Sequence, residues 1–145
     1  MNWLFIALVI FVIFKFMPVR KQAIDSEIYI IDGDTVRLAD GQRLRLKGID
    51  APEMSQPGGE EARAHLFTLL EGGDIRVALT GNDKYGRLVG TLYQGKMNVN
   101  KAMVSTGYAR GDRFSKSYLL HEAKARIKRS GLWSIGGIAD PRSYR

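Results

Sequence analysis

The chain has 145 residues with a formal net charge of +7, a length that fits one domain with a short extension and a sizeable core. It contains no cysteine, which excludes disulfides, thiolate metal sites and cysteine-linked lipids. Any metal must therefore be held by oxygen or histidine ligands.

The first segment is an apolar run at residues 3–19, interrupted by Lys15 and followed by Arg20 and Lys21. This run is about long enough to enter a bilayer, for which roughly 17 to 25 residues are needed. It has neither a basic start nor a small-x-small cleavage site, which favours an uncleaved single-span anchor over a removed signal peptide or a buried helix. We therefore expect residues 1–21 to form a hydrophobic anchor or signal segment. The basic flank favours a domain on the cytoplasmic side.

Charge is unevenly spread over the rest of the chain. Residues 22–95 carry a net charge of −4, and residues 96–145 carry +8. An acidic half suits a cation and a basic half suits a polyanion such as a nucleic acid. The alternative is a solvated helical face in the second half, and composition alone leaves both interpretations open.

The first half of this domain is typical of a β-hairpin system. Runs rich in β-branched residues predict strands at residues 28–31, 35–38 and 43–49. Asp40 and Gly41 mark a turn, for which we expect a three-residue loop with Gly41 in a left-handed conformation. We expect this loop to pair Leu38 with Leu44 and Val36 with Leu46, which keeps the apolar side chains on one face.

This register also places Asp50 opposite Asp32 and diagonal to Asp34, so three carboxylates should gather at the mouth of the sheet. The remaining periodicity predicts strands at residues 75–79 and 88–93, and helices at residues 60–70, about 99–105 and about 118–129. We therefore expect an α+β chain: a five-stranded OB-fold-like β-barrel with three helices, preceded by an N-terminal hydrophobic helix.

Three motifs in order identify a family. They are DGDTVRL at residues 32–38, RLKGIDAPE at 45–53 and DKYGR at 83–87, followed by Asn98-Val99-Asn100 and Gly131-Leu132-Trp133. From about residue 28 to 134 the chain resembles the staphylococcal nuclease (thermonuclease) family, so residues 22–145 are expected to form a staphylococcal nuclease-like OB-fold domain. The resemblance implies a calcium-dependent endonuclease that hydrolyses phosphodiester bonds of DNA and RNA, prefers single-stranded or frayed substrate and leaves 3′-phosphate ends.

The resemblance also implies the metal ligands. Asp34 and Asp50 match carboxylate ligands of Ca²⁺, and the main-chain carbonyl of Ala51 matches a third oxygen donor. Asp32 matches a residue that orients these ligands or their waters. Glu53 matches the glutamate beside the metal-bound water, where it would act as general base or as a water-orienting group.

Four further residues match positions that contact the substrate. Arg45 and Arg87 match two arginines whose guanidinium groups bind the reacting phosphate. Strand alternation puts Arg45 and Asp50 on opposite faces, so their convergence rests on a barrel curvature implied by the resemblance. Lys84 and Tyr85 match positions that contact the terminal phosphate and nucleotide.

Two other functions stay open as alternatives: a non-catalytic nucleic-acid-binding OB-fold module tethered to a membrane, and a tethered domain that grips a peptide or glycan. The nuclease is favoured because all five side chains expected for metal binding and catalysis are present together: Asp34, Arg45, Asp50, Glu53 and Arg87. We expect DNA and RNA as partners, membrane contact through residues 3–19 and no obligate protein partner. A calcium requirement suits the exterior of the cell, whereas the basic flank favours the cytoplasmic side. We therefore expect either a membrane-anchored or an exported domain, and both sides of the membrane stay open.

Overall fold

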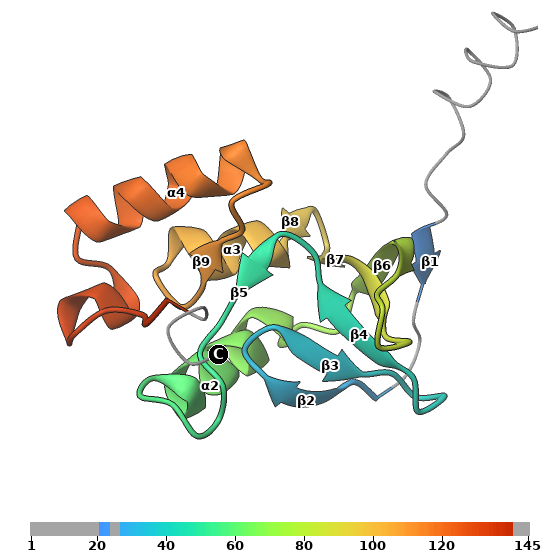
Figure 1. Ribbon diagram of the computed structural model, residues 1–145. Helices are drawn as coiled ribbons and strands as arrows, with labels where there is room; N and C mark the ends of the chain where they lie inside the picture. Colours follow the sequence, from blue (N-terminus) through green and yellow to red (C-terminus); the bar gives the residue numbers. More distant parts are fainter. Residues whose placement is uncertain (1–20, 24–26, 141–145) are drawn as a thin grey trace, which may run out of the picture.

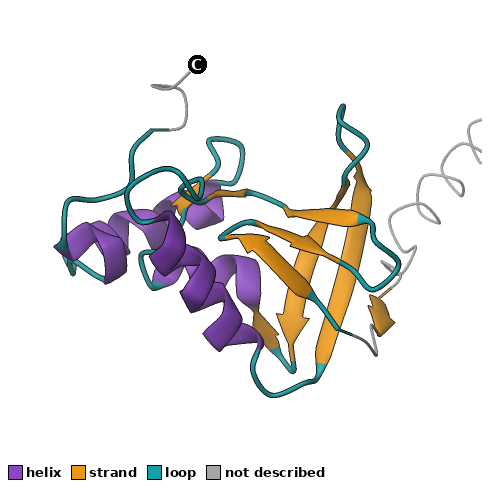
Figure 2. Cartoon of the chain, turned by 90° about the horizontal axis from the view of Figure 1, so that it is seen from below, coloured by secondary structure: helices purple, strands orange, loops and turns teal. Residues whose placement is uncertain are grey.

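The computed structural model describes residues 21–23 and 27–140. One end of the molecule is a seven-stranded sheet in the order β1-β6-β7-β4-β3-β2, with β8 also paired to β7, and the helices cover the other end (Figures 1 and 2). A separate two-stranded sheet joins β5 to β9. The strands are β1 (Lys21–Ala23), β2 (Tyr29–Asp32), β3 (Thr35–Arg37), β4 (Arg43–Leu46), β5 (Ile49–Asp50), β6 (Ile75–Asn82), β7 (Leu88–Gln94), β8 (Met97–Asn98) and β9 (Arg110–Gly111).

The helices are α2 (Gly59–Leu70), α3 (Val99–Ser105), α4 (Lys116–Ile127) and the 3-10 helix η1 (Gly131–Ser134). The predicted α+β class and three α-helices are confirmed within the described ranges. These ranges contain nine strands in two sheets, so the predicted number of five strands is wrong, while closure of the strands into an OB-fold-like barrel stays a prediction. The predicted strand at residues 43–49 is divided into β4 and β5.

The apolar run at residues 3–19 lies outside the described residues, so the expected anchor helix stays a prediction. Within the described ranges, no helix is both long enough and apolar enough to cross a bilayer.

The β3–β4 hairpin corrects the predicted register. Its loop has three residues, because Leu38 donates its N–H to Gln42 and the N–H of Gly41 bonds back to Leu38 at 2.9 Å. Gly41 has φ 87°, as a left-handed turn residue requires. A three-residue loop therefore pairs Val36 with Leu44, whereas the predicted partner was two residues further on. A slip of two residues preserves strand alternation, so the apolar side chains still share one face.

The core lies between the sheet and the first two helices. Alternation along β4 buries Leu44 and Leu46 and turns Arg43 and Arg45 away from the core. In α2 the buried positions are spaced four residues apart, at Ala62, Leu66 and Leu70, so one helical stripe packs on the strands. Further fully buried core side chains are Val36, Ile49, Val77, Leu92, Val99, Met103 and Val104. This core holds α2 against the hairpin that carries the candidate site.

Asn100, a fully buried amide at the start of α3, joins three parts of the fold. Its Oδ1 accepts the N–H of Leu92 at 3.1 Å, and its Nδ2 donates to the carbonyl oxygens of Lys47 and Gly90 at 3.0 and 3.1 Å. A buried backbone group that loses its partner costs about 1–3 kcal/mol. The side chain thus ties α3 to β7 and to the turn that follows β4.

We predict that Asn100→Ala lowers the free energy of unfolding by about 2–4 kcal/mol, because it leaves two buried backbone groups and one part-buried carbonyl without this partner. Urea denaturation measures the change. The matched control is Asn98→Ala, which removes the N-cap bond to Lys101 and a part-buried bond to the Tyr118 hydroxyl and should cost about 1 kcal/mol. Equal losses for the two variants would contradict the role given to Asn100.

Candidate active site

Two of the predicted carboxylates lie where β2 leads into β3: Asp32 ends β2, and Asp34 lies in the turn. The N–H of Asp34 donates to Oδ1 of Asp32 at 3.0 Å, so Asp32 shapes the turn. Asp34 is buried, and its Oδ2 accepts the N–H of Ala51 at 2.7 Å while its Oδ1 accepts the hydroxyl of Thr35. The bond to Ala51 joins the turn to the loop that follows β5.

Gly33 allows this approach. A Cβ atom added at Gly33 would lie 2.7 Å from Cβ of Ala51 and 2.8 Å from Cβ of Ala62 in α2. Both distances are below any normal contact, so the turn, the loop and the helix meet where only glycine fits. The position of Asp34 therefore depends on three small residues from three segments.

Arg45 bridges the two predicted metal-binding carboxylates. Its Nη2 lies 2.6 Å from Oδ1 of Asp50 and 3.3 Å from Oδ2 of Asp34. Its Nη1 also donates to the carbonyl oxygen of Leu46 at 2.8 Å. The expectation that strand alternation separates Arg45 from Asp50 is wrong. Gly48, with φ 79°, turns the chain between β4 and β5 and interrupts the alternation.

Burial dominates the electrostatics of Asp34. It raises the pKa of the Asp34 carboxyl to about 7, although the nearby Arg45 guanidinium lowers it, and the charge of Asp32 raises it further. Even with the Arg45 guanidinium nearby, Asp34 therefore holds a proton up to nearly neutral pH when no metal ion is bound. A buried carboxyl of this kind is ionised more easily when a positive ion binds to it.

The β6–β7 loop carries the other predicted arginine. Nε of Arg87 lies 2.6 Å from Oδ2 of Asp83, and the N–H groups of Tyr85 and Arg87 both donate to Oδ1 of Asp83. Burial raises the pKa of Asp83, but these hydrogen bonds outweigh it and the pKa is lowered. Sequence reasoning missed this role of Asp83, although an Asp that opens a glycine-containing turn is a known signal for such bonds.

Arg45 lies on β4, and Arg87 is the last loop residue before the neighbouring strand β7. Strands β4 and β7 are parallel and pair Arg45 with Val89, and Arg87 precedes that residue by two positions. In this structure the Arg87 guanidinium bonds to Asp83 in its own loop. The convergence of both arginines on one phosphate therefore stays a prediction.

The predicted substrate-binding pair lies on the same loop as Arg87. The Tyr85 ring is 72% exposed, with Nζ of Lys84 5.1 Å and Cζ of Arg87 5.5 Å from the ring centre. Two cations beside an accessible aromatic ring suit a phosphate next to a stacked base.

Glu53 follows Ala51 by two residues and is exposed. Its N–H bonds to the side chain of Gln56 at 2.8 Å, and its carboxylate has no hydrogen-bond or ion-pair partner among the described residues. Its backbone is tightly enclosed, because a Cβ at Gly59 would lie 2.1 Å from the Glu53 carbonyl oxygen. The segment is thus well positioned while its carboxylate faces solvent.

The donor set suits a hard cation in its chemistry. Asp34 and Asp50 bring two carboxylates to one guanidinium, and Ala51 follows Asp50 in the chain and donates its N–H to Asp34. Across residues 21–23 and 27–140, no group of three acidic, histidine or cysteine side chains forms a metal cluster. A cation here would therefore need main-chain oxygen or water to complete its shell.

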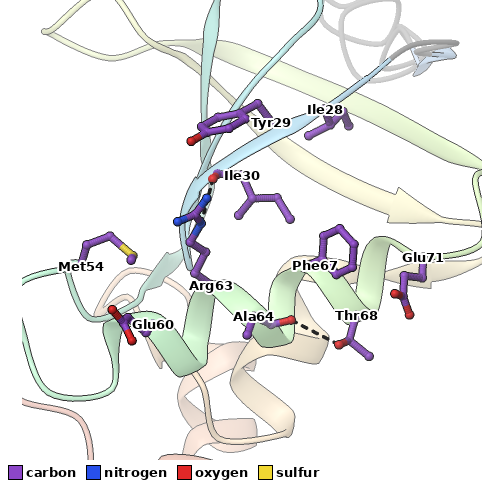
Figure 3. Close-up of a pocket in the computed structure, with 10 residues that line it drawn as sticks. All are labelled: Ile28, Tyr29, Ile30, Met54, Glu60, Arg63, Ala64, Phe67, Thr68 and Glu71. Carbon is purple, nitrogen blue, oxygen red and sulfur yellow. Dashed lines mark hydrogen bonds between the residues drawn. The ribbon is translucent and has the colours of Figure 1, made fainter.

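The β2 strand also borders a pocket that is separate from these residues. The pocket has a volume of about 780 Å³ and lies between β2 and α2 (Figure 3). Arg63 reaches across it from α2 and donates to the carbonyl oxygen of Ile30 at 3.1 Å. None of the predicted site residues lines this pocket.

Comparison with known proteins agrees with the motifs. Residues 43–135 match the model of the staphylococcal nuclease homologue family. The chain belongs to the staphylococcal nuclease family.

Several relatives of this staphylococcal nuclease-family chain are similar over most of its length. It is 38% identical over 135 residues to Protein ParB from Escherichia coli, covering 81% of this chain and 76% of the relative. It is 34% identical to an uncharacterized endonuclease from Haemophilus influenzae, covering 81% and 70%. It is 36% identical to Staphylococcal-like nuclease CAN1 from Arabidopsis thaliana, covering 74% and 34%. The chain thus spans only about a third of the length of its plant relatives, including 30% of a rice homologue.

We predict that the metal-free protein loses stability relative to Asp34→Asn as pH rises from about 4 to about 7. Native Asp34 holds its proton up to about pH 7, whereas the unfolded carboxyl releases it near pH 3.8. The stabilisation is therefore fully present below pH 3.8 and lost as pH approaches 7, by on the order of 2–4 kcal/mol. Denaturation in chelator across this pH range measures it.

The control for this pH series is Asp40→Asn, because hydrogen bonds from Gln42 lower the pKa of Asp40. Its stabilisation is present above the ordinary pKa of 3.8 and lost only as pH falls further. The difference between this variant and the wild type should therefore stay flat from about pH 4 to 7. If the stability difference between Asp34→Asn and the wild type also stayed constant over this pH range, the raised pKa assigned to the buried Asp34 would be wrong.

Gly33→Ala should destabilise the fold by about 1–3 kcal/mol, because its methyl group overlaps those of Ala51 and Ala62. We also expect faster hydrogen exchange at the Ala51 amide, since the turn must move away from it. Gly73→Ala is the control for the exchange measurement. Its φ of 81° means that alanine strains the backbone there, but its Cβ would contact nothing within 4 Å, so Ala51 should not move. If exchange at Ala51 were unchanged in Gly33→Ala, the close approach would not hold the two loops together.

Proposed function

We propose that this chain is a calcium-dependent nuclease that hydrolyses phosphodiester bonds of DNA and RNA and leaves 3′-phosphate ends. The observation that carries the proposal is the convergence of Asp34 and Asp50 on the Arg45 guanidinium, next to the Ala51–Glu53 segment. Relatives of the chain are named nucleases or endonucleases, which supports the same class of reaction.

Asp34, Asp50 and the carbonyl oxygen of Ala51 would hold the calcium ion. When bound, the ion supplies Lewis-acid polarisation of the phosphate and a more acidic water. The raised pKa of Asp34 supports this assignment, because a buried acid gains most from a positive ion beside it. Asp32 keeps the turn in shape through its bond to the Asp34 N–H.

Arg45 serves two states of the site. In this structure it bonds to oxygen atoms of Asp34 and Asp50, which are the same groups proposed to hold the cation. With a cation held by Asp34 and Asp50, the Arg45 guanidinium would no longer be needed to neutralise these carboxylates and would be free to bind a phosphate oxygen. A planar guanidinium can bond two such oxygens at once and so stabilises the charge that grows there during attack.

Glu53 and Arg87 complete the proposed reaction. The solvent-facing carboxylate of Glu53 would accept a proton from the attacking water or orient that water. Arg87 would exchange its bond to Asp83 for a second contact to the phosphoryl group.

The substrate proposal rests on the β6–β7 loop. Tyr85 offers an exposed ring for one base, with Lys84 beside it for a phosphate. Because a base must leave the duplex to stack on a side chain, this loop favours single-stranded or frayed DNA and RNA. We further propose that residues 3–19 tether the domain to a membrane.

In a test of the proposed nuclease, the full chain should degrade single-stranded DNA with Ca²⁺ and lose activity in chelator. Arg87→Ala should lower turnover about 100- to 1000-fold, because its contact strengthens as charge develops. Glu53→Gln should lower it about 100- to 10,000-fold. The matched control is Arg43→Ala, which removes an exposed arginine two residues from Arg45 and should leave turnover unchanged.

Product ends and binding are read in the same experiment. A 3′-phosphate end resists extension by a polymerase until a phosphatase removes the phosphate. If the wild type bound DNA but did not cut it with any metal ion, the nuclease proposal would be wrong and the non-catalytic nucleic-acid-binding module would take its place as the function. Equal losses in Arg43→Ala and Arg87→Ala would show that general charge, rather than placement, matters.

A further inference from the structure

Helix α4 presents a surface that the nuclease proposal does not use. Its inner positions Glu122 and Ala125 are buried, and the residues on the opposite side of the helix are exposed. At 100° per residue, Leu120, Ala123 and Ile127 fall within one narrow stripe on that side. Leu120 is 67% exposed and Ile127 is 83% exposed. We define the α4 outer face as Lys116, Leu120, Ala123, Lys124, Ile127 and Lys128.

The charge of the α4 outer face is entirely positive. Lys116, Lys124 and Lys128 are exposed around the aliphatic stripe. The acidic residue of the helix, Glu122, lies on the inner side, where it bonds to Arg126 and to the N–H of Gly111. The face thus combines two exposed branched side chains with three cations and no acid.

The combination of aliphatic and positively charged side chains decides which kind of partner fits the α4 outer face. A nucleic acid would bind the lysines, but its phosphates offer nothing to two exposed aliphatic side chains. A second copy that docked by the same face would bring like charges together. The interface of an anionic bilayer accepts both, because aliphatic side chains enter the acyl boundary and lysines bind the headgroups.

The position of the α4 outer face in the fold also suits contact with a bilayer. In Figure 1, α4 lies along the upper side of the molecule, and α3 and β9 separate it from the β2–β3 turn that carries Asp34. The first described residue is Lys21, so a single residue, Arg20, separates the apolar run at 3–19 from β1. A run of that length, inserted in a bilayer, would hold the domain close to its surface and favour a weak second contact.

We propose that the α4 outer face docks on the surface of an anionic phospholipid bilayer. The aliphatic stripe inserts at the headgroup boundary, and the three lysines bind the lipid phosphates. The turn that carries Asp34 is left facing away from the lipid, so the site stays open while the protein is docked.

The absence of cysteine from the chain makes the test direct, because one introduced cysteine carries one label. The full-length Ile127→Cys protein is labelled with nitrobenzoxadiazole and mixed with phosphatidylglycerol/phosphatidylcholine vesicles or with phosphatidylcholine alone. We expect a blue shift and quenching by spin-labelled lipid only with phosphatidylglycerol. Raising salt to about 0.5 M, or adding Lys124→Glu and Lys128→Glu, should abolish both signals because the headgroup attraction is screened or reversed.

The matched control is Thr68→Cys, an exposed position on α2. Its label should stay in water in every mixture, even when residues 3–19 insert. Equal signals at positions 127 and 68 would overturn the proposal, as would an equal response to both kinds of vesicle. A shift at position 127 on adding single-stranded DNA, with none on adding vesicles, would assign the face to nucleic acid instead.

Discussion

The candidate site depends on one close approach, where the β2–β3 turn meets the loop after β5 on the side of α2. Gly33 leaves room for the methyl groups of Ala51 and Ala62, and the Ala51 N–H then reaches the Asp34 carboxylate at 2.7 Å. A larger residue at any of these three positions would separate the carboxylate from the loop. Packing of α2 on the core therefore sets the geometry of the polar site directly, because the helix carries Ala62.

The same approach creates an electrostatic cost that Arg45 offsets. Burying Asp34 disfavours its charge, and the nearby Asp32 disfavours it further. Arg45 lies between Asp34 and Asp50 and neutralises both in part. Under the proposed calcium role, the cation would take the place of the Arg45 guanidinium at oxygen atoms that the fold has already gathered. Stability and function thus draw on the same group of charges.

Much of the arrangement could be predicted from the sequence, because it depends on local patterns. Helical periodicity located all three helices to within two residues, and Asp40-Gly41 predicted the three-residue turn. The predictions failed where a single residue interrupts the periodic pattern of a strand, or where a loop has no periodic pattern. Gly48 interrupts strand alternation, so the contact between Arg45 and Asp50 could not be derived by counting residues. Asp83 was missed because its three hydrogen bonds lie within a loop, which periodicity does not describe.

The basic second half of the chain shows why composition alone could not choose between a polyanion-binding surface and a solvated one. Arg110 and Arg126 both pair with Glu122, so these charges support the fold of α4 rather than a surface. The lysines of the outer face have no such role, and net charge cannot separate the two groups. Exposure decides the matter, because Leu120 and Ile127 lie among those lysines at a cost in water that a purely solvated face would avoid. In the docked state proposed above, the bilayer surface covers these two side chains together with the lysines around them.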